Sequence, residues 1–254
     1  ASPSSAEKGA TITITLSPDK GYKLDKLTVT DGSGKTVSTV KKSDTVYTFT
    51  MPASAVKVGV SYVKATETPS ETKFNDVSAN DWFASAVDYV TGKGMMNGTA
   101  DNTFSPKANT TRGMVVTVLY RLENQPSTSA ASFTDVASGA YYANAVAWAN
   151  ANGIVSGYGS GKFGPNDKVT REQLAAILYR YAQYKKYDVS VGEDTNILSY
   201  DDAQSISSYA IPAIQWACGA GVVTGKSGSK LDSKGNATRA EVAAMLMRFC
   251  ENVK

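Results

Sequence analysis

Every arginine of this chain falls on one of two columns of a threefold repeat. The first column holds Arg112, Arg171 and Arg239, and the second lies nine residues further along. Counting back from the first column without a gap, aromatic residues recur 30 residues upstream and glycines recur 18 and 14 residues upstream. Repeats of this length cannot bury their apolar faces alone, so we expect three units packed on one another around a pseudo-threefold axis.

A threonine precedes each first-column arginine and marks the start of an apolar helical segment. In TREQ (170–173), Thr170 and Gln173 suit a capping box, in which each side chain bonds the other residue's backbone N–H. A cation at the first helical position lies beside the positive end of the helix dipole, which costs about 0.3–1 kcal/mol. Three such arginines indicate a role other than starting a helix.

Each repeat is predicted to be a helix, a loop and a second helix. YYANAVAWANANG (141–153) carries apolar residues at helical spacing and ends on Gly153, which suits the left-handed position after a helix. A loop rich in Gly and Pro turns follows, and the Thr-Arg helix begins at its end.

The first 64 residues follow a different pattern, because apolar and polar residues alternate as they do in β-strands. We expect a hairpin-type turn in DGSGK (31–35) and strands at 11–16, 26–30, 46–51 and 56–63.

The fold class is therefore α+β and multidomain, with a small N-terminal β domain followed by a mainly α-helical unit of three helix-loop-helix repeats. The expected domains are the β domain at 1–64, a linker at 65–73, and repeats at 74–124, 133–184 and 198–254.

Composition argues against several classes of function. The net charge of +3 is too small to indicate nucleic-acid binding, and no stretch approaches the roughly 18 apolar residues of a membrane span. The chain lacks histidine, the commonest general base and zinc ligand, so no catalytic residue, metal site or cofactor is predicted. Its first residues lack the pattern of a secretory leader, which leaves a cytosolic protein or a mature or cut part of a secreted one.

Cys218 and Cys250 are the only cysteines, and both lie in apolar helical segments of the third repeat. Two thiols cannot complete a structural zinc site unaided. They fit two alternatives, namely small core residues or a disulfide.

The motifs of the helical region resemble those of the S-layer homology (SLH) family. The second repeat carries them most fully, as FTDV, AVAWA, GIVSG, FGPND and TREQ, and the resemblance covers 74–254 in three copies. It implies an intramolecular pseudo-trimer, compatible with a monomer in solution, that anchors bacterial surface proteins non-covalently to secondary cell-wall polysaccharide. This glycan often carries pyruvate ketals, so the implied partner is an acidic polysaccharide and the implied location is the extracellular cell wall.

The other two repeats depart from the family pattern. Repeat one has Gly113 and Met114 where the family has Ala and Glu, so it lacks the capping-box Glu. Repeat three has Leu231 and Ser233 in place of the Phe-x-Pro pair. The segment 9–63 resembles internalin-type B-repeats, which are usually spacers or adhesin modules.

In the SLH family the arginine of the Thr-Arg motif supplies a cation to the acidic glycan, which maps onto Arg112, Arg171 and Arg239. A guanidinium can bind a carboxylate through two parallel hydrogen bonds, and a helix N-terminus adds unpaired N–H groups. The alternative is a structural ion pair, and both roles are compatible if an aspartate orients the arginine. The candidate aspartates recur 36 or 37 residues upstream, at Asp76, Asp135 and Asp202.

The aromatic residues that begin each first helix are candidates for packing against sugar C–H faces, with a core role as the alternative. They are Trp82, Tyr141 and Tyr209. Seven residues further on, Tyr89, Trp148 and Trp216 are expected in the core. The second-column arginines lie about 180° around the helix from the first column, so we expect them outside its groove, solvated or in salt bridges.

The expected function is thus a wall-binding module and not an enzyme. One alternative is a structural or adhesive segment whose repeats serve self-assembly. A second alternative is a glycan-acting enzyme fragment. It is the weaker one, because the sequence contains no nucleophile elbow, P-loop or metal cluster.

Overall fold

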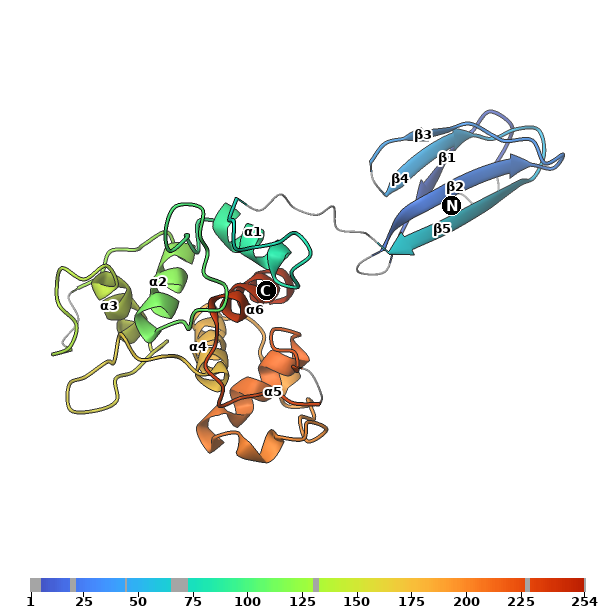
Figure 1. Ribbon diagram of the computed structural model, residues 1–254. Helices are drawn as coiled ribbons and strands as arrows, with labels where there is room; N and C mark the ends of the chain where they lie inside the picture. Colours follow the sequence, from blue (N-terminus) through green and yellow to red (C-terminus); the bar gives the residue numbers. More distant parts are fainter. Residues whose placement is uncertain are drawn as a thin grey trace. The chain divides into compact units, whose positions relative to one another are not determined.

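The computed structural model describes residues 6–18, 22–43, 45–64, 73–129, 133–226 and 229–253. By its internal contacts the chain divides into two units, Ala1–Thr68 and Pro69–Lys254 (Figure 1). The expected linker at 65–73 lies outside the described residues except for its last residue.

The alternating pattern of the first unit produces two small antiparallel sheets. One has the order β1-β4-β3, with β1 at Thr11–Thr15, β4 at Val46–Thr50 and β3 at Thr39–Lys41. The other pairs β2 (Tyr22–Asp31) with β5 (Val56–Lys64). Inward-facing apolar residues of both sheets form the core, namely Ile12, Ile14, Leu16, Val29 and Phe49.

The strand predictions hold except for β3, whose three residues are too few for an alternating pattern to be recognised. The turn at 31–35 forms, because the Asp31 carboxylate accepts the backbone N–H groups of Ser33 and Lys35 at 2.9 Å each. The turn brings Thr30 and Thr36 together in a short antiparallel bridge, but β3 further along pairs with β4 and not with β2.

The described part of the second unit contains six α-helices, two in each repeat: α1 (Ala84–Gly92), α2 (Arg112–Leu122), α3 (Ala143–Ala151), α4 (Arg171–Tyr184), α5 (Ile211–Gly219) and α6 (Arg239–Asn252). The first helix of each repeat packs against the second helix of the preceding repeat, α3 on α2 and α5 on α4. The ring closes where α1 packs on α6 (Figure 1). This arrangement confirms three helix-loop-helix repeats packed on one another. Among the described residues, no helix has both the length and the apolar character needed to cross a bilayer.

Three backbone hydrogen bonds form a closed ring where the three repeats meet. The N–H of Thr110 donates to the carbonyl of Ala237 at 3.0 Å, and that of Val169 donates to Thr110 at 3.0 Å. The N–H of Ala237 donates to Val169 at 2.8 Å and completes the ring. Each repeat therefore donates to one neighbour and accepts from the other, as a pseudo-threefold arrangement requires.

Local signals start α2, α4 and α6 as the sequence predicts, whereas the first helix of each repeat begins two residues after Trp82, Tyr141 or Tyr209. The helices α4 and α6 begin with complete capping boxes. In α2, the Met114 side chain cannot accept the N–H of Thr111, so the capping box is incomplete. The Thr111 hydroxyl still accepts the N–H of Met114 at 3.4 Å. The first helices end before glycines in the left-handed region at φ of 67–69°, namely Gly94, Gly153 and Gly221.

One apolar core runs through the helical unit. Trp148 and Trp216 are buried in it, as predicted, whereas Tyr89 is only partly buried and packs against it. Cys218 and Cys250 are free thiols that are partly buried against the same core, so the disulfide alternative is wrong. Burial raises the pKa of Cys218 to about 11, which keeps this thiol protonated at neutral pH.

The aspartate column fixes the loop of its own repeat. The two carboxylate oxygens of Asp135 accept the backbone N–H groups of Phe163 and Gly164 at 2.8 Å each. These bonds, chiefly the one from Phe163, hold the pKa of Asp135 below its ordinary value. Equivalent pairs at 2.7–2.8 Å join Asp76 to Phe104 and Ser105, and Asp202 to Leu231 and Asp232.

We predict that Asp135→Ala lowers the free energy of unfolding at pH 7 by about 1–3 kcal/mol, because two backbone donors lose a charged acceptor. The pKa of Asp135 is lower in the folded chain than its ordinary 3.8, so the carboxylate stabilises the fold above that value. Its contribution disappears as the pH falls through the folded pKa. In urea unfolding, the difference in free energy of unfolding between wild type and variant should be smaller at pH 3 than at pH 7. Equal stability of both proteins at pH 7 would contradict this role.

Candidate functional site

The first-column arginines join neighbouring repeats through main-chain carbonyl groups. Arg112 of the first repeat donates from Nε to the carbonyl of Phe163 at 3.0 Å and from Nη2 to that of Ser156 at 2.8 Å, both in the second repeat. The guanidinium also lies 4.5 Å from the centre of the Tyr158 ring. Equivalent bonds of 2.6–2.9 Å run from Arg171 to Leu231 and Thr224, and from Arg239 to Phe104 and Asn97.

The N-termini of α2, α4 and α6 are also bound by a neighbouring repeat. The N–H of Arg112 donates to the carbonyl of Asp167 at 3.0 Å, and that of Gly113 donates to Pro165 at 2.9 Å. The expectation of unpaired N–H groups for an anion is therefore wrong at these two positions. Carbonyl oxygens from the next repeat surround both the N-terminus and the guanidinium, which offsets the unfavourable position of the cation.

The aspartates do not form ion pairs with these arginines in the described part of the chain. Phe163 instead connects the two, because its N–H donates to Asp135 and its carbonyl accepts from Arg112. The aspartate thus fixes the loop that carries the acceptor of the arginine. The expected ion pairs between these arginines and Asp76, Asp135 or Asp202 are therefore not formed, and the aspartates lie outside the three grooves described next.

Three grooves lie between the repeats, and each combines residues from all three. Each contains one first-column arginine, one second-column arginine and one of the candidate aromatic residues. The Arg112 groove (about 260 Å³) contains Arg112, Arg180 and Tyr209; the Arg171 groove (about 490 Å³) contains Arg171, Arg248 and Trp82; the Arg239 groove (about 450 Å³) contains Arg239, Arg121 and Tyr141.

The second-column arginines are the groove residues that sequence reasoning missed. A position nine residues along a helix does lie on its opposite side, as expected, but that side faces the adjacent groove. Arg180 of α4 therefore lies in the groove of Arg112, whereas Arg171 at the start of the same helix lies in another. The signal was present in the sequence, because this column recurs as strictly as the first.

The three candidate aromatic residues are exposed rather than buried in the core. Trp82 and Tyr141 keep 64% of their surface exposed and Tyr209 keeps 52%. The Tyr209 hydroxyl donates to the buried Glu172 carboxylate at 3.3 Å, which also accepts the Lys234 ammonium at 2.9 Å. Burial, together with Glu172, raises the pKa of Tyr209 to about 12, so its ring presents a protonated hydroxyl at neutral pH.

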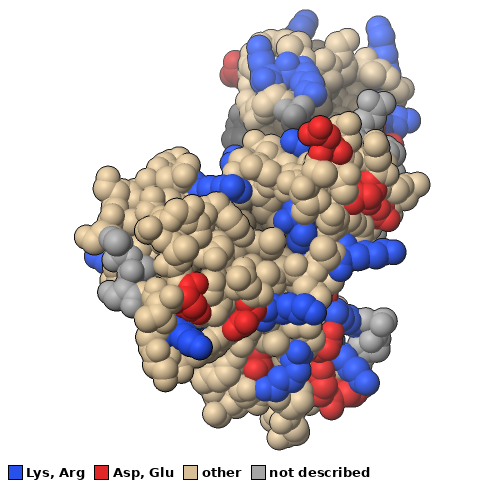
Figure 2. Space-filling view, turned by 60° about the vertical axis from the view of Figure 1, so that its left-hand side comes forward, with Lys and Arg blue, Asp and Glu red and all other residues tan. Residues whose placement is uncertain are grey.

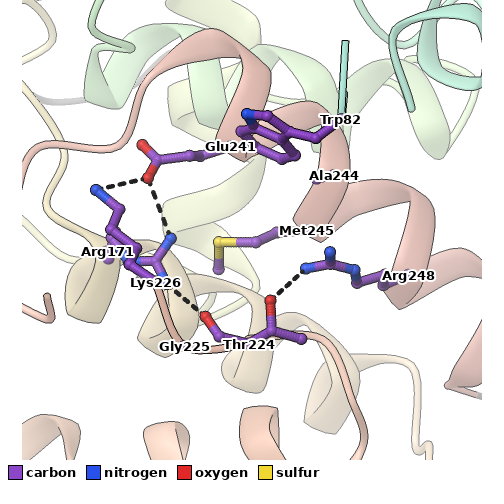
Figure 3. Close-up of a pocket in the computed structure, with 9 residues that line it drawn as sticks. All are labelled: Trp82, Arg171, Thr224, Gly225, Lys226, Glu241, Ala244, Met245 and Arg248. Carbon is purple, nitrogen blue, oxygen red and sulfur yellow. Dashed lines mark hydrogen bonds and ion pairs between the residues drawn. The ribbon is translucent and has the colours of Figure 1, made fainter. Parts of the chain in front are cut away.

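The Arg171 groove contains a carboxylate of its own. Glu241 Oε1 lies 3.3 Å from Arg171 Nη1 and 2.8 Å from Lys226 Nζ, while Arg248 donates to the Thr224 hydroxyl at 3.1 Å (Figure 3). The face shown in Figure 2 has basic and acidic side chains interspersed rather than a continuous basic surface. Within the described ranges, no cluster of three or more His, Cys, Asp or Glu could hold a metal ion.

Comparison with known proteins agrees with this architecture. The family model of the S-layer homology domain matches residues 73–113, 132–175 and 199–243. The chain belongs to the S-layer homology domain family. A model of the divergent InlB B-repeat domain matches residues 1–66 in the β unit. Both resemblances seen in the sequence are confirmed.

The chain is similar to parts of longer proteins. It is 33% identical over 183 residues to an amylopullulanase of Thermoanaerobacterium thermosulfurigenes, covering 70% of this chain and 9% of the relative. It is 26% identical to the surface-layer 125 kDa protein of Lysinibacillus sphaericus (81% of this chain, 17% of the relative). It is 27% identical to an S-layer protein of Bacillus thuringiensis subsp. finitimus (78% and 23%).

The chain spans less than a quarter of the length of these relatives. SLH domains are anchoring modules that bind cell-wall polymer, and the surface-layer relatives agree with that role. The extracellular cell surface and cell wall are therefore the location of this chain.

We predict that the two arginines of one groove differ in their effect on stability. Arg112→Ala should lower the free energy of unfolding by about 2–4 kcal/mol, because two carbonyls at the repeat interface lose their donor. Arg180 has no hydrogen bond or ion pair with the described residues, so Arg180→Ala should cost less than about 1 kcal/mol. Urea unfolding of both variants measures the difference, and equal losses would contradict the cross-linking role of Arg112.

Proposed function

We propose that the helical unit anchors its protein by binding carboxylates of pyruvylated secondary cell-wall polysaccharide in the grooves between its repeats. SLH domains bind cell-wall polymer in general. The observation that carries the finer proposal is the convergence of two guanidinium groups and one exposed aromatic ring in each groove.

This arrangement matches the chemistry of a pyruvate ketal on a sugar. The ketal presents one carboxylate, and a guanidinium donates strong charge-assisted hydrogen bonds to a carboxylate. Arg112 uses Nε and Nη2 on the protein, while its Nη1 has no hydrogen-bond partner among the described residues. The half-buried Arg180 supplies a second cation, and the exposed Tyr209 ring offers a surface for sugar C–H groups.

We also infer that the chain binds the glycan without cleaving it. The match to the amylopullulanase covers only 9% of that enzyme. The recurring aspartates are held by loop N–H groups, as Asp135 is by Phe163 and Gly164, so they do not present a pair of carboxylates to a groove. Anchoring therefore accounts for the repeated site better than catalysis.

We predict that the triple variant Arg121→Ala, Arg180→Ala and Arg248→Ala binds a short pyruvylated wall oligosaccharide at least about tenfold more weakly. Each groove loses one charged donor, and a hydrogen bond to a charged group contributes about 1.5–3 kcal/mol. These arginines do not bond a neighbouring repeat's carbonyl as the first column does. Titration calorimetry measures the change, and sedimentation with purified cell wall checks it on the polymer.

The matched control removes three positive charges elsewhere, as Lys57→Ala, Lys93→Ala and Lys162→Ala, none of which lines a groove. It should bind as the wild type does, which separates groove chemistry from the change in net charge. The decisive comparison uses the same oligosaccharide after removal of its pyruvate. Equal wild-type affinity for both forms would overturn carboxylate recognition.

A further inference from the structure

The third residue of α2, α4 and α6 differs between the repeats and lines a different groove in each case. Met114 lies in the Arg239 groove, Gln173 in the Arg112 groove and Glu241 in the Arg171 groove. The three grooves are therefore built alike from their arginines and aromatic residues, but they differ chemically at this position and at a second equivalent one, which is Lys226 in the Arg171 groove, Tyr158 in the Arg112 groove and Thr99 in the Arg239 groove.

In the Arg171 groove this position already supplies the carboxylate that a cationic groove attracts. Glu241 is 6% exposed and contacts both Arg171 and Lys226 (Figure 3). Burial by itself raises its pKa, but the contacts with Lys226, Thr238 and Arg171 lower the pKa below the ordinary value. Glu241 is thus ionised at neutral pH and occupies the Nη1 donor that is unpaired in Arg112.

In the Arg112 groove the same position is neutral. Gln173 Oε1 accepts the N–H of Thr170 at 3.0 Å, and its amide nitrogen has no partner among the described residues. The carboxylate nearest to the groove's aromatic residue is Glu172, which is 3% exposed and already accepts hydrogen bonds from Ser207, Tyr209 and Lys234. Glu172 therefore holds the Tyr209 ring in place without lining the groove.

The Arg239 groove also lacks an acidic lining residue, but its lining is less polar than that of the Arg112 groove. Met114 replaces the amide of Gln173, and Met96 and Val118 add apolar surface. No hydrogen bond of the Tyr141 hydroxyl to the described residues corresponds to the one that holds Tyr209 in place. This groove has the same number of arginines with less polar surroundings.

We propose that the three grooves are not equivalent, and that the acidic group of the polymer binds first in the Arg112 groove, next in the Arg239 groove and last in the Arg171 groove. Glu241 acts as an internal substitute for the ligand's carboxylate in the last of these. The ranking rests on the proposed function, since it assumes that the grooves take a carboxylate.

The test exchanges the two equivalent residues, as Gln173→Glu and Glu241→Gln. Either residue can complete the capping box, so both variants retain the start of their helix. The probe is the pyruvate ketal of methyl N-acetylmannosaminide, with the unpyruvylated glycoside as control. The chain has six arginines, two in each groove, so the six Nε–H signals in a ¹⁵N NMR spectrum report each groove separately.

In the wild type, the Arg112 and Arg180 signals should shift at the lowest probe concentration and those of Arg171 and Arg248 at the highest. Gln173→Glu should raise the concentration needed for the first pair by about tenfold or more, the effect of placing a like charge beside the bound carboxylate. Glu241→Gln should lower the concentration needed for the Arg171 groove toward that of the Arg112 groove. Thermal unfolding of both variants confirms that they are folded.

Equal midpoints for the three grooves in the wild type, or a first response from Arg171 and Arg248, would overturn the ranking while leaving carboxylate binding intact. A failure of all six signals to respond to the ketal would overturn the proposed carboxylate recognition itself, and the ranking with it. Midpoints unchanged by both substitutions would show that Glu241 does not act as a substitute carboxylate.

Discussion

The bonds between arginine side chains and main-chain carbonyls of the next repeat are the interaction on which the helical unit depends. An arginine at the first position of an isolated helix is unfavourable, because it adds a cation to the positive end of the dipole. In the assembled unit, Arg112, Arg171 and Arg239 each bond two carbonyls supplied by a neighbouring repeat. The compensation exists only when the repeats are together, so it favours a fold in which all three assemble cooperatively.

The same contacts determine where a ligand can be recognised. A guanidinium held by Nε and Nη2 on the protein keeps a fixed orientation, and each of these arginines lines a groove. The partner arginine and the aromatic residue come from the two other repeats. Since one residue both joins the repeats and lines the groove, the first-column arginines are poor positions at which to separate binding from stability. Arg121, Arg180 and Arg248 allow that separation because they do not carry the interface.

In the pseudo-threefold arrangement, the side chains of one groove can change while the other two grooves keep their structure. The backbone ring through Thr110, Val169 and Ala237 uses only main-chain groups, so it tolerates different side chains in the three repeats. Repeat three keeps its loop although Leu231 and Ser233 replace the Phe-x-Pro pair, because the loop is held by Asp202 through backbone N–H groups. The third position of α2, α4 and α6 makes no such main-chain bond between repeats in the described part of the chain, which is consistent with the different residues found there, Met114, Gln173 and Glu241.

The sequence by itself determined the features that depend on neighbouring residues. The arginine columns predicted three repeats, and the motifs within the repeats indicated their family by resemblance. Capping pairs, left-handed glycines and apolar periodicity predicted where the helices lie. Capping pairs and left-handed glycines act within one or two helical turns, so they can be recognised without the rest of the fold. Only the tertiary structure decided which groups meet: that Asp135 bonds loop N–H groups and not an arginine, that both thiols stay free, and that Arg180 shares a groove with Arg112. Each side of a helix is covered by a different part of the ring of repeats. Which residues lie there depends on contacts between residues that are far apart in the chain.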